Sequence, residues 1–323
     1  MSEQIPLAKK SRVWQISKSK VFSYYALPTY IILLSLIVCG GIMSPYFLTP
    51  PNIRNVLVQA TPVLIVSIGQ TFVILTGGID ISVGSVLTLS DCVAAHLMGD
   101  NLLGIVMVCA LCLSIGAGAG LINGLAVTKL KVFPFVITLA TMSIFQGIAF
   151  LVSPVPSGYI PISFEYLSRG MLGPVPLPVV MMGGMVFVAY LILSKTSLGR
   201  YLYAVGGDEE NARLSGINSS LVKISSYMIC GLLAAFGGLF IASRSACADP
   251  RVGGLYGFDS ITAVLIGNTY LFGGQGGIGG TIAGAFIVAM LSNFLNMLGM
   301  TSFIQWILKG IIMTLAVSFT LRR

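Results

Sequence analysis

The hydrophobic positions of this 323-residue chain gather into long runs separated by short polar stretches. Ten such runs lie at residues 28–43, 56–76, 81–98, 102–127, 132–152, 177–194, 221–243, 260–272, 278–298 and 303–320. Most of them hold the ~20 apolar residues that a helix needs to cross a bilayer. Run 81–98 contains Asp91 and His96, and run 260–272 is too short to cross alone. These two runs fit broken or re-entrant segments shielded by protein, so we expect about ten spanning helices, with a range of eight to ten.

Composition supports a location in the bilayer. Hydrophobic residues make up 56% of the chain, charged residues only 9%, and the mean hydropathy is +0.95. A soluble domain carries about 25% charged residues, so these values exclude a soluble enzyme. We predict an all-α, polytopic membrane protein in which residues 1–323 form a single membrane-embedded domain. The six cysteines fall mostly inside apolar runs and are expected to be packing residues.

The lysines and arginines predict the orientation of the spans. With the N-terminus in the cytoplasm, alternation of ten spans places thirteen basic residues inside and only Arg54, Arg169, Arg244 and Arg251 outside. This asymmetry favours ten spans with both termini cytoplasmic. Residues 1–24 then form a cytoplasmic segment before an uncleaved first span, since no small-residue cleavage site closely follows the first run.

Glycine is frequent, with 38 residues, and it clusters inside the runs. Gly116, Gly118, Gly120 and Gly124 share one run, and Gly280 and Gly284 share another. Small residues four positions apart let helix backbones approach closely in lipid. We therefore expect a tightly packed bundle.

The longest hydrophilic stretch covers residues 195–223 and lies on the cytoplasmic side by the charge argument. Gly206 and Gly207 are expected to break the chain before a short helix over 209–214, capped by Asp208 or its neighbour and ended by Gly216. Such a helix can dock into a groove on another protein and transmit motion to the bundle, or it can be a solvated connector.

Four stretches of the chain resemble a known family in order along the sequence. They are ILTGGIDISVGSVLTLS from Ile74, GLINGLAVTKLKVFPFVITLATMSIFQGIAF from Gly120, GGDEENARLSGIN from Gly206, and the C-terminal part from FGGQGGIGGTIAGAF onward. This pattern is similar to that of the permease subunits of carbohydrate-uptake ABC transporters of the ribose type. The chain departs from the pattern at Asp208, where Asn is usual, at Gly257, where an acidic residue is expected, and at Asn268, where Gly is expected.

The resemblance implies a permease subunit of an importer for a monosaccharide or sugar-like molecule in the bacterial inner membrane. Its partners would be two ATPase subunits, a second permease subunit (identical or related) and an external sugar-binding protein. In that family the loop matched here contacts the ATPase. The residues that the resemblance assigns to this coupling contact are Gly207, Asp208, Glu209, Glu210, Ala212, Arg213, Leu214 and Gly216.

Polar side chains within the apolar runs are candidates for a sugar path, which needs hydrogen-bonding groups and an aromatic face. The candidates are Gln70, Phe72, Asn123, Phe145, Gln146, Asn293 and Asn296. Polar groups also bridge membrane helices for purely structural reasons, and that alternative holds for each of them.

Four ionisable residues in or beside the runs are expected to be paired or functional, because an unpaired charge there is costly. They are Asp80, Asp91, Asp259 and Lys309. Asp80 follows Gly77 and Gly78 and is expected to cap the third span, with substrate contact as the alternative. Lys309 is expected either to reach the inner interface or to pair with Asp80 or a backbone carbonyl.

The sequence predicts no catalytic centre. The single histidine excludes a multi-histidine metal site, and no P-loop motif occurs, so ATP-Mg, if used, is bound by a partner and this chain needs no cofactor of its own. The stretch 274–279 fits a dinucleotide fingerprint but lies between two spans, where a plain turn is expected. The net charge of +8 is attributed to orientation in the bilayer and not to nucleic acid.

Two other classes of function remain open from the sequence. An ion-coupled secondary sugar transporter would use Asp91 or Asp259 as its coupling carboxylate. A channel or membrane scaffold would pass solute without pumping. On the outer side, the proline-rich stretch 153–178 and residues 246–257 suit either a docking platform for a binding protein or simple covers for the helix ends.

Overall fold

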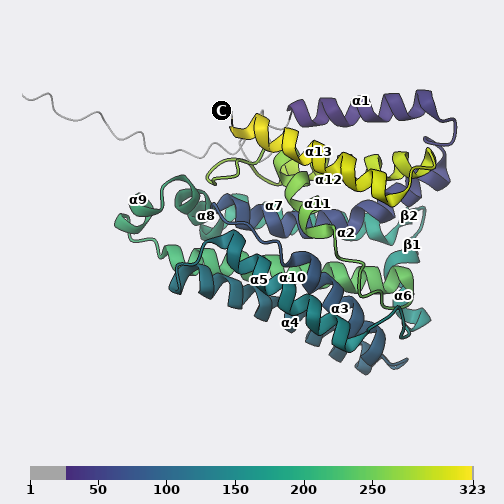
Figure 1. Cartoon of the computed structure of the whole chain (residues 1–323), viewed down its shortest axis with the longest axis horizontal. Helices are drawn as coiled ribbons and strands as arrows, with labels where there is room; N and C mark the ends of the chain where they lie inside the picture. Colours follow the sequence, from purple (N-terminus) through teal and green to yellow (C-terminus); the bar gives the residue numbers. More distant parts are fainter. Residues whose placement is uncertain (1–26, 322–323) are drawn as a thin grey trace, which may run out of the picture.

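The computed structural model describes residues 27–321, so the expected cytoplasmic segment 1–24 lies outside the described residues. The described part is a helical bundle with one two-stranded hairpin (Figure 1). The helices are α1 (Leu27–Met43), α2 (Pro50–Leu75), α3 (Val83–Leu97), α4 (Leu102–Lys129), α5 (Pro134–Val152), α6 (Ile162–Arg169), α7 (Leu177–Lys195), α8 (Ser197–Gly207), α9 (Glu209–Leu214), α10 (Ser219–Ser245), α11 (Tyr256–Ile266), α12 (Ile278–Met297) and α13 (Ser302–Leu321). The strands are β1 (Met171–Leu172) and β2 (Val175–Pro176), which pair antiparallel around Gly173.

The bundle has a buried inner set of helices and an outer set with exposed apolar side chains. In the most apolar window of α2, 83% of the residues are buried, whereas α5 and α7 bury 22% each. The outer helices expose large apolar side chains such as Ile42, Leu151 and Phe187. Because such surfaces are insoluble in water, they fit contact with lipid or with other membrane subunits.

Helix α4 packs on α10 through glycine, as the spacing of four predicts. A Cβ atom on Gly116 would lie 2.3 Å from the carbonyl oxygen of Gly231, and one on Gly120 would lie 2.1 Å from that of Tyr227. Gly118, on another face of α4, has no atom within 4 Å of such a Cβ. The close approach of the two backbones therefore depends on Gly116 and Gly120 and not on Gly118.

Two inner helices are too short to cross a membrane. At 1.5 Å per residue, α3 is about 22 Å long and α11 about 16 Å long, against a hydrocarbon thickness of about 30 Å. Residues 83–95 of α3 and 259–265 of α11 are buried. The two weak runs therefore form broken segments shielded by other helices, as the sequence indicates.

Each predicted apolar run overlaps a helix, although run 260–272 is helical only as far as Ile266. Six helices are long and apolar enough to cross a membrane, and four shorter ones, α1, α3, α11 and part of α13, make up the remaining runs. The structure thus supports a multi-pass membrane protein, and the figure of ten spans stays a prediction.

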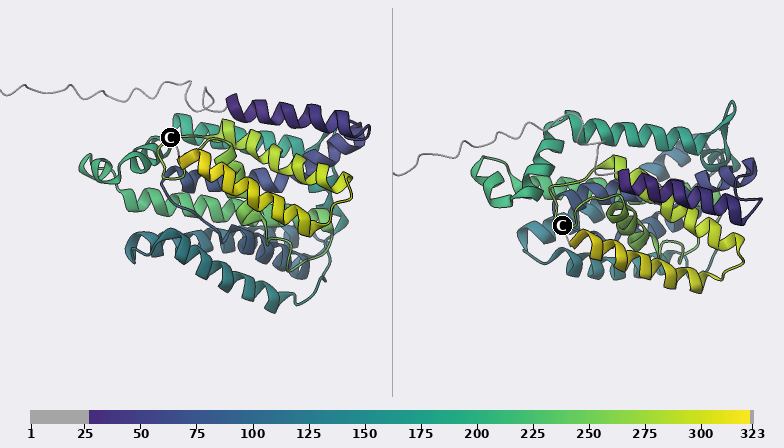
Figure 2. Two further views of the ribbon diagram at one scale, coloured as in Figure 1. Left: turned by 45° about the horizontal axis from the view of Figure 1, so that its top comes forward. Right: turned by 90° about the horizontal axis from the view of Figure 1, so that it is seen from above.

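The long hydrophilic stretch is more ordered than its sequence suggests. Besides the expected short helix α9, it contains α8, which the sequence analysis missed. Gly206 and Gly207 do not interrupt the chain before α9 but form the last turn of α8. Helix α9 projects from one end of the bundle, where α13 also ends, whereas α6 and the hairpin lie at the opposite end (Figures 1 and 2).

Candidate functional site

Helix α9 brings the predicted coupling residues together at one end of the molecule. Asp208 is its N-cap, because its Oδ1 accepts a hydrogen bond from the Asn211 N–H at 2.9 Å. Gly216 ends the turn with φ at +83°, a conformation that glycine adopts readily. The predicted cap and stop are both confirmed.

The side chains of α9 divide into an inner and an outer set. Ala212 is buried against the bundle, whereas Arg213 and Leu214 are exposed. Arg213 forms an ion pair with Glu210 at 2.6 Å, which fixes the guanidinium on the outer side of the helix. The exposed set offers a charged and apolar surface to another protein.

An ion pair joins α9 to the first turn of α10. Lys223 Nζ lies 2.5 Å from Glu209 Oε2. Partial burial alone would raise the pKa of Glu209, but the bond and charge of Lys223 and a bond from Ser219 outweigh burial and lower this pKa. The carboxylate is therefore ionised at neutral pH and ties α9 to a long inner helix.

Helix α8 rests on the glycine-rich turn between α11 and α12. Tyr203 Oη donates to the Gly276 carbonyl at 2.9 Å, and the Gly274 N–H donates to the Leu75 carbonyl at 3.0 Å. A Cβ on Gly206 would lie 1.8 Å from that same carbonyl oxygen. These contacts join α8 to the end of α2 and to the turn that follows α11. In the described residues no strand precedes this turn, so its dinucleotide-like pattern is the plain turn that the sequence analysis expects.

A buried polar network holds the break between α2 and α3. Asp80 Oδ1 accepts from the N–H and hydroxyl of Ser82 at 2.9 and 2.6 Å. With the amide nitrogen of Gln70 facing the Asp80 carbonyl, Gln70 donates to that carbonyl at 3.1 Å and accepts from the backbone N–H of Asp80 at 3.2 Å. Asn123 donates to Ser82 Oγ at 2.8 Å and accepts from Thr141 at 2.8 Å. Asp80 therefore does not cap α3 itself, whose N-cap is Ser82, but fixes the turn just before it.

Most of the predicted sugar-path residues form contacts between helices or lie in the core. Gln70 and Asn123 belong to the buried network, and Phe72 and Phe145 are buried in hydrophobic clusters. Asn293 exchanges two hydrogen bonds with Asn52, at 2.9 and 3.1 Å, and Asn296 accepts from Gln305 at 2.7 Å. The polar groups of these six residues join helices or their rings fill the core, and a part for them in a sugar path stays a prediction.

Gln146, another path candidate, lines a cavity. The cavity has a volume of about 340 Å³ and lies between α3, α5, α11 and α13. The sequence analysis missed the other side chains that give it its character, Ser85, Phe150, Arg251, Phe258 and Trp306. Trp306 could have been picked as a candidate from the sequence, because it is the only tryptophan within an apolar run.

Removing Asn123 should destabilise the fold without changing which solute is transported. Asn123→Leu keeps the side-chain size but leaves Asp80, Ser82 and Thr141 with fewer partners in a buried site. We expect the free energy of unfolding to fall by about 1–3 kcal/mol, measured as a lower thermal transition in detergent. The control Asn55→Leu alters an exposed asparagine of α2 and should leave the transition nearly unchanged; equal losses in both would contradict the assigned network.

The remaining intramembrane charges each have a defined partner. Lys309 Nζ lies 2.7 Å from Asp259 Oδ2, so its partner is Asp259 on α11 and not Asp80, which was one of the alternatives expected from the sequence. This ion pair joins α13 to α11. Asp91 Oδ2 accepts from the Asp249 N–H at 2.9 Å and so anchors the loop between α10 and α11, while no donor reaches its Oδ1 among the described residues.

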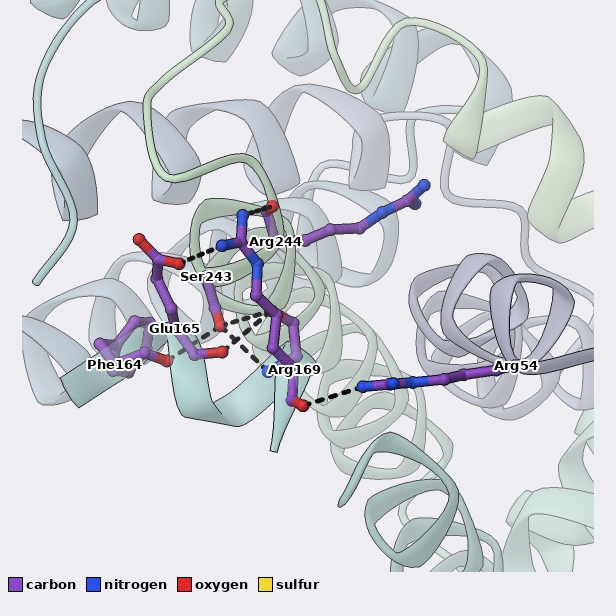
Figure 3. Close-up of polar contacts among 7 residues, drawn as sticks. Arg54, Phe164, Glu165, Arg169, Ser243 and Arg244 are labelled. Atoms are coloured by element: carbon purple, nitrogen blue, oxygen red, sulfur yellow. Dashed lines mark hydrogen bonds and ion pairs between the residues drawn. The ribbon is translucent and has the colours of Figure 1, made fainter. Parts of the chain in front are cut away.

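At the opposite end from α9, α6 is fixed to the bundle by a compact set of polar contacts (Figure 3). Ser243 Oγ on α10 donates to the Phe164 carbonyl at 2.9 Å and accepts from the Ser168 N–H at 3.1 Å. Arg169 pairs with Glu165 at 2.6 Å, and Arg54 donates to the Arg169 carbonyl at 3.1 Å. These contacts fix α6 to the bundle, and the choice between a docking platform and a cover for the helix ends stays a prediction.

Comparison with known proteins identifies the family. Residues 52–317 match the family model described as "Branched-chain amino acid transport system / permease component". This chain belongs to that permease family. The expected resemblance to membrane permeases of multi-subunit transport systems is thereby confirmed.

Several curated relatives are similar over nearly their whole length. The ribose import permease protein RbsC of Escherichia coli (strain K12) is 42% identical, covering 89% of this chain and 91% of the relative. The RbsC protein of Bacillus subtilis (strain 168) is 40% identical, covering 88% and 89%. The D-allose transport system permease protein AlsC of Escherichia coli (strain K12) is 33% identical, covering 90% of each chain. No solved structure matches this chain.

Proposed function

We propose that this chain is the membrane-spanning subunit of an ATP-driven importer for a monosaccharide or sugar-like molecule. The observation that carries this proposal is the similarity to relatives named as ribose and allose permeases over about 90% of the chain. The family description refers to a permease component, which fits a chain that works with other subunits. The chain would lie in a bacterial inner membrane as one domain of ten spans, with both termini in the cytoplasm.

Helix α9 would be the contact for the ATPase subunits, which bind ATP-Mg. Its support is the exposed set on α9 at one end of the bundle and the tight contacts of α8 with the turn before α12. Closure of two ATPase subunits would move α9 and, through that turn, α11 and α12. A second permease subunit would complete the pore against the apolar outer helices.

The opposite face would receive the binding protein. Arg54, Arg169 and Arg244 cluster around α6 (Figure 3), so an acidic patch on the partner is the expected complement. The contacts of Ser243 and Glu165 keep this face rigid, which lowers the entropic cost of docking.

The ion-coupled alternative has no comparable support. Asp259, one of its two candidate carboxylates, is already paired with Lys309, and Asp91 accepts a backbone hydrogen bond that anchors an external loop. The channel or scaffold alternative is excluded if the assembled transporter accumulates sugar against a gradient.

The coupling role of α9 predicts a large effect of reversing one charge. Arg213→Glu places an acidic group beside Glu210 on the exposed face, so ATPase binding and sugar uptake should both fall by about tenfold or more. Membrane insertion should be unaffected because Arg213 is exposed outside the apolar runs. The measurement is co-purification of the ATPase together with uptake in cells.

Arg200→Glu is the matched control, since Arg200 is an exposed arginine of α8 on the same side of the bundle. This variant should keep most of the ATPase binding. An Arg213→Glu protein that retains its ATPase at the level of the unaltered chain would overturn the proposed coupling contact.

A further inference from the structure

We propose that the cavity between α3, α5, α11 and α13 is a transient binding site for a neutral monosaccharide during transport. This inference rests on the proposed importer function and adds the site within it. The cavity has a volume of about 340 Å³, at the small end of the roughly 300–1,000 Å³ typical of ligand pockets. This volume suits a single sugar ring and not a larger solute. The side chains that give the cavity its chemistry are Ser85, Gln146, Phe150, Arg251, Phe258 and Trp306.

Three aromatic rings from three different helices line this one cavity. Phe150 of α5, Phe258 of α11 and Trp306 of α13 are 39%, 42% and 54% exposed. Aromatic rings that line a cavity offer flat apolar faces, and a sugar ring presents a matching apolar face of C–H groups. The rings therefore provide stacking surfaces without requiring a charged ligand.

The polar groups of the cavity suit hydroxyl groups. Gln146 Nε2 donates to the Pro250 carbonyl at 2.7 Å, which fixes the amide and leaves Oε1 free of donors among the described residues. Ser85 Oγ donates to the Ser82 carbonyl at 2.8 Å, so its lone pairs remain as acceptors. Arg251 contributes a guanidinium, which only donates. Together they offer both acceptors and donors to the hydroxyls of a sugar.

The charge of the lining argues against an amino acid. No acidic residue is among the residues that line the cavity, so an ammonium group would find no carboxylate there. Arg251 alone would favour a negative charge, but it is an exposed side chain on the loop between α10 and α11, where water screens it. A neutral polyhydroxylated ligand is therefore the best match.

The walls of the cavity are held rigidly around the proposed ligand. Gly253 N–H donates to Thr88 Oγ1 at 3.0 Å, and a Cβ on Gly84 would lie 2.4 Å from the Gly253 carbonyl oxygen, so the loop packs directly on α3. Ile81 lines the cavity, and its neighbour in sequence is Asp80 of the buried network.

The Asp259–Lys309 ion pair positions two of the aromatic rings. Asp259 follows Phe258 on α11, and Lys309 lies one helical turn after Trp306 on α13. The turn that α8 contacts follows the C-terminal end of α11. A shift of α9 would therefore move α11 and alter the spacing of these rings. The same helix movement would then release the sugar.

The test uses the complete transporter in proteoliposomes, with the ATPase, the second permease and the binding protein present. Uptake of radiolabelled D-ribose, D-allose, D-galactose, D-fructose and L-leucine is measured beside ATP hydrolysis. In Trp306→Ala, sugar transported per ATP hydrolysed should fall by about fivefold to tenfold, because the stacking face is lost while ATPase contacts are untouched. Trp306→Phe should keep about half or more of the ratio of sugar transported to ATP hydrolysed, since a phenyl ring still stacks.

Phe187→Ala, which removes an exposed ring from α7 far from the cavity in sequence and not among its lining residues, should transport normally. If the unaltered complex moves none of the four sugars, or moves leucine in preference, the proposed function and the sugar site both fail. If it moves a sugar and both Trp306→Ala and Gln146→Leu keep the full ratio of sugar to ATP, the site alone fails.

A second measurement decides the matter should Trp306→Ala not assemble. Trp14 and Trp306 are the two tryptophans of the chain, so a Trp14→Phe chain reports Trp306 alone by fluorescence. The transported sugar should change this emission in a saturable way, and L-leucine should not. An emission that no sugar changes overturns the site.

Discussion

Replacing Gly120 by alanine is expected to cause a large loss of stability. The new Cβ would lie 2.1 Å from the Tyr227 carbonyl oxygen, and the backbone of α10 cannot yield as a flexible side chain would. Overpacking of this kind costs about 1–3 kcal/mol and occasionally more. A lower thermal transition of the purified protein and a reduced yield from membranes are the measurements.

Gly118→Ala is the matched control on the same helix. Nothing lies within 4 Å of its added Cβ, so the substitution should be neutral or slightly stabilising, by roughly 0.5–1 kcal/mol from the better helix propensity of alanine. The packing of α4 on α10 is wrongly described if the two variants lose the same stability.

Removing one partner of the Asp259–Lys309 ion pair is the second change from which we expect a large loss of stability. The two side chains are 12% and 17% exposed, and removal of one partner strands the other charge in the bundle. For such pairs the loss is about 3–5 kcal/mol, whereas replacing both partners is often close to neutral. Asp259→Asn and Lys309→Met should therefore each impair folding and uptake, and the double variant should recover much of both.

This double-mutant cycle also separates two functions. If Asp259 were the coupling carboxylate of an ion-driven transporter, the double variant would fold but would not accumulate solute. Recovery of ATP-driven uptake in the double variant would show that the pair is structural. Uptake lost in all three variants despite normal folding would contradict the structural role assigned here.

The sequence predicted well the features that depend on neighbours along the chain. Apolar runs mark helices because every residue of a span meets lipid or protein, and the Asp208 cap and Gly216 stop of α9 follow from local backbone chemistry. The broken segments α3 and α11 were also predictable, since their apolar runs are too short or carry ionisable groups. Helix α8 was not predicted because it lies in the longest hydrophilic stretch and contains three glycines, which favour a loop.

The site residues were harder to predict because polarity within a span has two causes. Gln70 and Asn123 look like path residues in the sequence, yet they satisfy the backbone and the carboxylate of Asp80, which lies in a non-helical break. Which face of its helix a polar residue occupies, and whether a break lies opposite, depends on tertiary packing. The partner of Lys309 was misjudged for the same reason, since Asp259 is 50 positions away in sequence.

The measurement that tests the central claim most directly is solute accumulation in proteoliposomes by the purified chain, alone and with its proposed partners. With the ATPase subunits, the second permease, the binding protein and ATP-Mg present, a sugar should accumulate above its external concentration, and omission of any one component should abolish this. The chain alone should show no accumulation under a proton or sodium gradient. Uphill transport by the chain alone would contradict the account.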